Sequence, residues 1–178
     1  MCLWTLLVVL WLGYPMSYLG LWQRPQFQYI GVDIVPSVIE NNIQRFQNVS
    51  NMKFTLFDIS TRPLTITKKT DGKSAIFSRD ALQHLSFDLV ISTLQNFARS
   101  NVDYVIVGSY QNVGRNANIS TGEYFAIDLS SSPFGLPAPL EVIEEETPDK
   151  KHLVIYARRH LQQVDFNKMR MDAQKYFS

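Results

Sequence analysis

The sequence YIGVDIVP at residues 29–36 has the pattern of a short buried strand that ends in an acid and leads into a helix. Pro36 suits the first turn of a helix, because its ring fixes a helical φ and its missing N–H would be unpaired there. In a doubly wound α/β sheet, an acid in the place of Asp33 lies in the crevice where nucleotides bind, and it can accept hydrogen bonds from a ribose. Asp33 is therefore the first candidate ligand-binding residue.

Strand and helix patterns alternate along the rest of the chain. We expect strands over residues 28–34, 52–57, 74–78 and 103–108, helices from 36 and over 87–99, an extended segment at 124–129, a hairpin of 140–143 with 152–157, and a last helix within 162–176. The first two helices should each have an apolar stripe, formed by Val38, Ile39, Ile43 and Phe46 and by Leu89, Val90, Leu94 and Phe97. This order predicts an α/β fold with a mostly parallel sheet and a C-terminal antiparallel hairpin at its edge.

Polar residues follow several of the expected strands. Ligands of such sheets bind beyond the carboxyl ends of the strands. That rule places Asp33, Asp58, the pair Arg79 and Asp80, and the pair Ser109 and Tyr110 on one rim.

The composition bounds the class of protein. A chain of 178 residues with 46% hydrophobic and 19% charged residues is long and apolar enough for one domain with a real core. Its net charge of +1 argues against duplex nucleic acid as a partner, which requires a basic face. Cys2 is the single cysteine, so an internal disulfide and a cysteine metal site are excluded. The histidines His84, His152 and His160 show no metal-ligand spacing, and we expect no metal.

The first 23 residues contain no charged residue, and Arg24 is the first. Three alternatives stay open: a membrane anchor, which needs about 20 apolar residues, a signal peptide, or a strand and helix of the core. We therefore divide the chain into a hydrophobic N-terminal segment, 1–23, and an α/β domain, 24–178. A core segment implies a cytoplasmic protein, and an anchor or signal implies the membrane, through residues 1–22, or the secretory pathway.

Five ordered segments support a family resemblance. They are GVDIVP at 31–36, FDI at 57–59, RDALQHL at 79–85, NISTG at 118–122 and PFGLP at 133–137. Through these five segments, the sequence from about Tyr29 to Arg159 resembles the class I S-adenosylmethionine-dependent methyltransferases. The resemblance implies a Rossmann-like, methyltransferase-like fold and S-adenosyl-L-methionine as a small-molecule cofactor, with a methyl acceptor that is unknown.

The resemblance also implies cofactor-binding roles at the first two strand ends. Asp33, with Ile34 beside it, takes the place of the acid that accepts hydrogen bonds from the ribose hydroxyls. Asp58 takes the place of the acid that binds the adenine amino group, and Ile59 supplies a backbone N–H and an apolar face. The structural alternatives are an acid at a helix N-terminus for Asp33 and a turn-capping residue before Thr61 for Asp58.

The third expected strand end carries candidates for the chemistry. The resemblance places Arg79 toward the methionine part of the cofactor. Asp80 and His84 are candidate catalytic bases that remove a proton from an accepting nitrogen or oxygen. The alternative is that Asp80 caps a helix and that His84 packs on it.

The sequence departs from the family at the first strand. The family has an acidic, glycine-containing loop there, which is degenerate or missing here: Gly13 is the only candidate, in a first strand of about 5–12 followed by a helix remnant at 16–21. Two functions therefore compete, methyl transfer and a non-catalytic relative tethered to a membrane by residues 1–22. A third alternative, a nicotinamide-dependent oxidoreductase, lacks its Gly-x-Gly-x-x-Gly motif.

Overall fold

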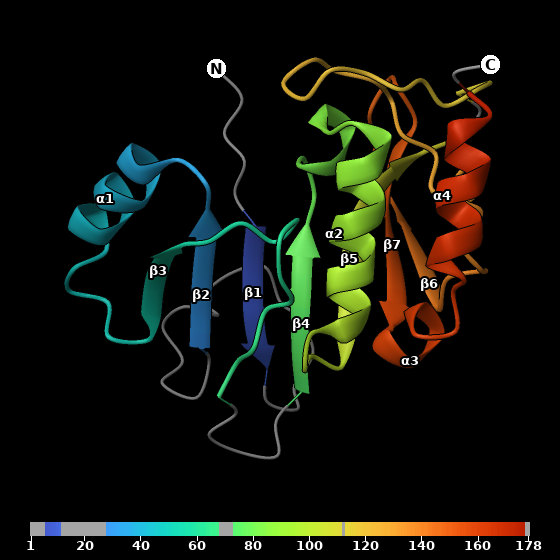
Figure 1. The fold of residues 1–178 in the computed structure, drawn as a ribbon. Coiled ribbons are helices and arrows are strands. Elements are labelled where there is room, and N and C mark those ends of the chain that lie inside the picture. Colours follow the sequence, from blue (N-terminus) through green and yellow to red (C-terminus); the bar gives the residue numbers. More distant parts are fainter. Residues whose placement is uncertain (1–5, 12–27, 68–72, 112, 177–178) are drawn as a thin grey trace.

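The computed structural model describes residues 6–11, 28–67, 73–111 and 113–176. Within these ranges seven strands form one sheet in the order β3-β2-β1-β4-β5-β7-β6 (Figure 1). The strands are β1 (Leu6–Trp11), β2 (Gln28–Asp33), β3 (Met52–Leu56), β4 (Lys73–Ser78), β5 (Tyr104–Tyr110), β6 (Glu141–Glu144) and β7 (Lys151–Ala157). The helices are α1 (Pro36–Arg45), α2 (Phe87–Arg99), α3 (Arg158–Leu161) and α4 (Phe166–Gln174), with a short 3₁₀ turn, η2 (Leu82–His84). The fold is a mixed α/β fold.

Most of the predicted elements are confirmed. The helix α2 has the predicted bounds, and β2 and β3 each end one residue before the predicted strand does. The hairpin of β6 and β7 is antiparallel and lies at the edge of the sheet, with Val142 paired to Val154. The segment at 124–129 is not a strand, although it is hydrogen bonded through Phe125 N–H to the Gln83 carbonyl.

The direction of β1 was not predicted. β1 is antiparallel to both of its neighbours, β2 and β4, whereas β2 with β3 and β4 with β5 are parallel. The described sheet is therefore mixed, and the prediction of a mostly parallel sheet is wrong. Side chains alternate in the same way in both directions of a strand, so the residue pattern of β1 does not fix its direction. The strand order β3-β2-β1-β4-β5 matches that of doubly wound sheets, but the direction of β1 does not.

The hydrophobic core lies between one face of the sheet and α2. The predicted apolar stripe of α2 is confirmed at Val90, Leu94 and Phe97, which are fully buried, while Leu89 is half-buried. Strand residues such as Ile76 and Val105, which pair in register, are also fully buried. α2 packs against α3 and α4, so these helices cover the core together (Figure 1).

The predicted apolar stripe of α1 is only partly buried. α1 contacts β2 and β3 at one end of the sheet (Figure 1), and Phe46 just after it stacks on Phe54 of β3 with 5.5 Å between ring centroids. Ile39 is buried, but Ile43 is 50% exposed.

The hydrophobic N-terminal segment is described only at residues 6–11. These residues form β1, in agreement with the core-strand alternative. Gly13 and the expected helix remnant at 16–21 lie outside the described residues. In the described ranges no helix has the length and hydrophobicity to cross a bilayer.

Candidate functional site

Four strands, β2, β3, β4 and β5, run in the same direction and end at one edge of the sheet, which we call the carboxyl edge. Asp33 ends β2, and the Phe57 N–H donates to the Asp33 carbonyl across 2.9 Å, which places the segment after β3 beside it. Arg79 and Asp80 follow β4, and Tyr110 ends β5. The strands therefore bring the predicted rim residues to one edge, as the sequence indicated.

The Asp33 carboxylate is held in a local turn. Its Oδ1 accepts the Val35 N–H across 2.9 Å, and the residue is only 3% exposed. Its neighbour Ile34 is 54% exposed. At the end of β2 the apolar side chain thus faces solvent, and the acid is covered.

Asp58 caps the turn after β3. Its Oδ1 accepts the Ser60 N–H across 2.9 Å and the Ser60 hydroxyl across 2.6 Å, and its carbonyl accepts the Thr61 hydroxyl. Ile59 is half-buried, and its carbonyl accepts the Asn96 side-chain amide from α2 across 2.7 Å. The turn-capping alternative for Asp58 is therefore what the structure contains, and it leaves the carboxylate half-buried at the edge.

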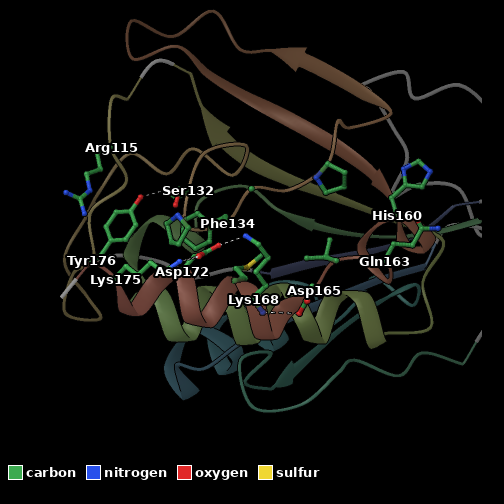
Figure 2. Close-up of a pocket in the computed structure, with 15 residues that line it drawn as sticks. Arg115, Ser132, Phe134, His160, Gln163, Asp165, Lys168, Asp172, Lys175 and Tyr176 are labelled. Carbon is green, nitrogen blue, oxygen red and sulfur yellow. Dashed lines mark hydrogen bonds and ion pairs between the residues drawn. The ribbon is translucent and has the colours of Figure 1, made fainter. Parts of the chain in front are cut away.

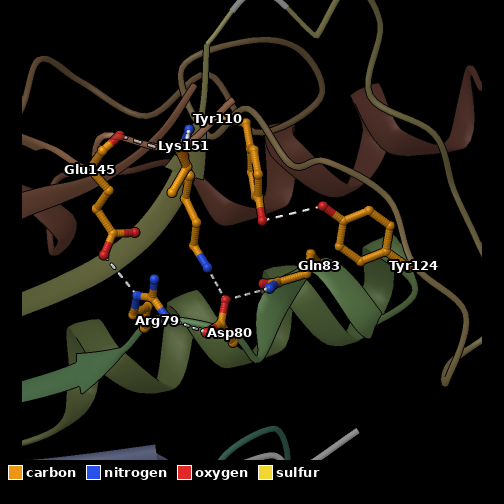
Figure 3. Close-up of polar contacts among 8 residues, drawn as sticks. Arg79, Asp80, Gln83, Tyr110, Tyr124, Glu145 and Lys151 are labelled. Atoms are coloured by element: carbon orange, nitrogen blue, oxygen red, sulfur yellow. Dashed lines mark hydrogen bonds and ion pairs between the residues drawn. The ribbon is translucent and has the colours of Figure 1, made fainter. Parts of the chain in front are cut away.

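A chain of ion pairs extends from Arg79 and Asp80 to the β6–β7 hairpin (Figure 3). The Arg79 guanidinium donates to Glu145 across 2.8 Å and to Asp80 across 2.9 Å. Asp80 also accepts the Gln83 amide across 3.0 Å and the Lys151 ammonium. The chain therefore ties the end of β4 to residues on both sides of the hairpin turn.

Lys151 is the buried cation of this chain of ion pairs. Its side chain is 7% exposed, and its Nζ lies 5.8 Å from the centre of the Tyr110 ring. Burial raises the pKa of Asp80, whereas the hydrogen bond and charge of Lys151, together with Arg79 and Gln83, lower it. The lowering effects are larger in sum, so the pKa of Asp80 lies below its usual value. Asp80 is thus ionised and fully engaged, an arrangement that favours holding charges in place over taking up a proton.

His84 lies in η2, beside the loop at 121–125. Its Nδ1 lies 2.8 Å from the Glu123 carbonyl oxygen, and because a carbonyl only accepts, Nδ1 carries the proton. The His84 ring is 5.5 Å from the ring of Tyr124, which is 54% exposed. His84 is thus oriented as a base would be, by a donor bond through its other nitrogen.

Two tyrosines complete the cluster. The Tyr124 hydroxyl donates to the Tyr110 hydroxyl across 3.2 Å (Figure 3). Tyr110 is 3% exposed, and burial raises its pKa far above the usual range, so it stays neutral. Among these residues the sequence placed Tyr110 on the rim and missed Tyr124, Glu145 and Lys151. Lys151 pairs with Tyr110 in the register of β7 against β5, and only a prediction of that register would have found it.

Gly108 lets the end of β4 lie against β5. A Cβ at this position would be 2.2 Å from the Arg79 carbonyl oxygen, closer than any side chain allows. The absence of a side chain at Gly108 therefore positions Arg79 and, through it, the ion-pair chain.

A separate groove of about 820 Å³ lies between α4 and residues 132–137 (Figure 2). At its rim, Lys168 and Lys175 both pair with Asp172, each across 2.6 Å, and the Arg115 guanidinium stacks 4.2 Å from the centre of the Tyr176 ring. None of the predicted site residues lines this groove. Its lysines are exposed and share one carboxylate, so it has the character of a solvated surface.

Neither a metal-binding cluster nor a known family identifies the site. The described residues contain no group of three histidine, cysteine or acidic side chains that could hold a metal ion. A scan against protein-family models and a search of curated proteins each find no match for this sequence.

Proposed function

We propose that the protein is a class I methyltransferase-like protein whose carboxyl edge binds the adenosine half of S-adenosyl-L-methionine. One observation carries the proposal: two exposed apolar side chains lie at the ends of the neighbouring strands β2 and β3, where the acids Asp33 and Asp58 also lie. They are Ile34, directly after β2 and 54% exposed, and Leu56, the last residue of β3 and 51% exposed. An adenosine presents ribose hydroxyls, which carboxylates accept, and an adenine ring, which apolar side chains contact.

The residues of this edge fit the adenosine half of the cofactor. Ile34 and Leu56 offer apolar surface to the adenine, and Asp58 offers a half-buried carboxylate. Asp33 is only 3% exposed, so the residues packed over its carboxylate would have to move before it could accept hydrogen bonds from the ribose hydroxyls. When bound, the cofactor supplies an electrophilic methyl group on a sulfonium.

On the acceptor side, the protein's own residues would orient a nucleophile at the ends of β4 and β5. Most of the rate would come from holding the nucleophile in line with the methyl group. His84, oriented by the Glu123 carbonyl, is the better candidate for removing a proton, because Asp80 is engaged by Lys151 and Arg79. Asp80 would instead hold these cations beside the site.

A second candidate, a non-catalytic relative, is favoured by the direction of β1. Trp11 at the end of β1 pairs with Lys73 at the start of β4, so β1 ends at the edge opposite Asp33. Residues 1–23 also contain no aspartate or glutamate, so this segment offers no acid for the methionine amino group. In that case the edge binds adenosine and does not hold the methionine half.

Calorimetric titration separates these candidates. We would titrate the full chain with S-adenosylmethionine and with adenosine, and repeat both with Asp33→Asn and with the exposed control Glu141→Gln. A methyltransferase binds S-adenosylmethionine more tightly than adenosine, and a non-catalytic relative binds both equally. In either case Asp33→Asn weakens binding about tenfold and Glu141→Gln does not. No heat with either compound would overturn the proposal.

A further inference from the structure

A pocket of about 300 Å³ lies on the β5–β7–β6 part of the sheet, beside the segment at 128–130. Alternation along β7 places His152, Val154 and Tyr156 toward this pocket and Lys151 on the opposite face. The pocket is therefore separate from the ion-pair chain of Asp80. Its volume is at the lower end of the range for small-molecule sites.

Tyr156 lines this pocket. The residue is 2% exposed, its hydroxyl makes no hydrogen bond to a described residue, and the hydroxyl is not one of the fully enclosed polar atoms of the described residues. The hydroxyl therefore keeps some accessible surface. Because a tyrosine hydroxyl can both donate and accept, it is available to a molecule in the pocket.

Asp128 supplies a negative charge to the same pocket. Its Oδ1 accepts the Ser130 N–H across 2.9 Å and the Ser130 hydroxyl across 2.6 Å, and its Oδ2 accepts the Ser131 hydroxyl across 2.7 Å. Burial raises the pKa of Asp128, but these bonds lower it below its usual value, so the carboxyl is ionised at neutral pH. All these donors are neutral, and no described lysine or arginine pairs with the carboxylate.

The Asp128 charge acts on Tyr156. Burial and then this charge raise the pKa of Tyr156 to about 12, so the phenol stays neutral with the carboxylate near it. None of the described residues that line the pocket is a lysine or an arginine. At the rim, Gln111 donates to Glu144 across 3.0 Å, and Glu144 pairs in register with His152. The described lining of the pocket therefore carries the negative charge of Asp128 with no lysine or arginine to balance it.

We propose that this pocket binds a small organic cation, an ammonium group on a short apolar body. The ammonium would donate to Asp128 and to the Tyr156 hydroxyl, forming a charge-assisted bond that a neutral ligand cannot make. The apolar body would contact Val154 and Leu129, which also line the pocket. An anion would meet repulsion from Asp128. The inference does not depend on the proposed function, because its residues lie away from Asp33 and Asp58.

Nuclear magnetic resonance of labelled tyrosine rings tests the proposal on the full chain. The probes are propylammonium, its neutral analogue butanol and the anion butyrate. We expect saturable shifts of the Tyr156 ring with propylammonium, and binding at least about tenfold weaker for butanol and butyrate. Asp128→Asn should weaken propylammonium binding about tenfold, and Tyr156→Phe about fivefold. The exposed acid Glu40 of α1 provides the control Glu40→Gln, which should bind as the wild type does.

Three results would overturn the proposal. They are non-saturating shifts with propylammonium, equal binding of butanol or butyrate, and unchanged binding in a folded Asp128→Asn or Tyr156→Phe variant. Tyr156→Phe removes one hydroxyl only, so it keeps the test decisive if Asp128→Asn fails to fold.

Discussion

Lys151 and Asp80 form an ion pair that joins the first residue of β7 to the second residue after β4. The Lys151 side chain is 7% exposed and the Asp80 side chain 43%, so a buried cation depends on a carboxylate that faces the carboxyl edge. Arg79 extends the pair to Glu145 on the other side of the hairpin turn (Figure 3). The position of the hairpin and the charge state of Asp80 are therefore linked.

Lys151→Met should destabilise the protein. The change removes the cation and leaves Asp80 with Arg79 and Gln83, and because Asp80 is partly exposed we expect a loss of about 1–2 kcal/mol, below that of a fully buried pair. Urea unfolding measures the change in free energy. The control Lys168→Met removes an exposed ion pair of α4 and should destabilise the protein much less than Lys151→Met does. Equal losses in the two variants would contradict the account.

Acid should remove the stabilisation that ionised Asp80 provides. Its folded-state pKa is lowered, so this stabilisation is fully present above the unfolded pKa, about 3.9, and is lost as the pH falls through the lower folded value. We expect the gap in unfolding free energy between the wild type and Lys151→Met to narrow below about pH 4. A gap that stays constant down to about pH 2 would show that Asp80 is not the group linked to Lys151.

Gly108→Ala should be more destabilising than Gly31→Ala. An added Cβ at Gly108 meets the backbone of Arg79 at 2.2 Å, whereas at Gly31 it meets the Phe54 ring at 2.6 Å, which can rotate. We expect a loss of about 2–3 kcal/mol for Gly108→Ala and a smaller loss for Gly31→Ala. Thermal unfolding of both variants checks the order, and the reverse order would contradict the close approach of β4 and β5.

Ile34→Ser should weaken adenosine binding without changing stability. Ile34 is 54% exposed, so its loss should change the free energy of unfolding by no more than about 0.5 kcal/mol. Removing its apolar surface from an adenine site should weaken binding several-fold, by about 1 kcal/mol. Scanning calorimetry measures the stability and titration calorimetry measures the adenosine affinity, on the same preparations. Unchanged adenosine affinity would mean that Ile34 does not contact the ring.

The sequence predicted the elements better than their directions. The apolar run that ends at Asp33 located β2, and the stripe of Val90, Leu94 and Phe97 located α2. The same reasoning could not predict that β1 runs antiparallel, because alternation of side chains is the same in both directions of a strand. Direction depends on the connection, which is a property of the chain between strands.

The sequence predicted the site residues that lie at strand ends. It missed those that reach the site through the pairing of strands distant in the sequence. Asp33, Asp58 and Asp80 lie at the carboxyl edge because each follows a recognisable strand. Lys151 enters the site only through the register of β7 against β5, which the pattern of each strand taken alone does not reveal. The sequence also did not predict that Asp33 is buried, because burial at a strand end depends on tertiary packing.

Amide shifts on adding S-adenosylhomocysteine to the labelled protein locate the ligand on the fold, and so they test whether the carboxyl edge binds the adenosine group. We expect the largest changes on the backbone amides of Val35, Phe57 and Ile59 at the ends of β2 and β3. Changes centred on the α4 groove around Lys168 and Tyr176, or no changes at all, would contradict this expectation.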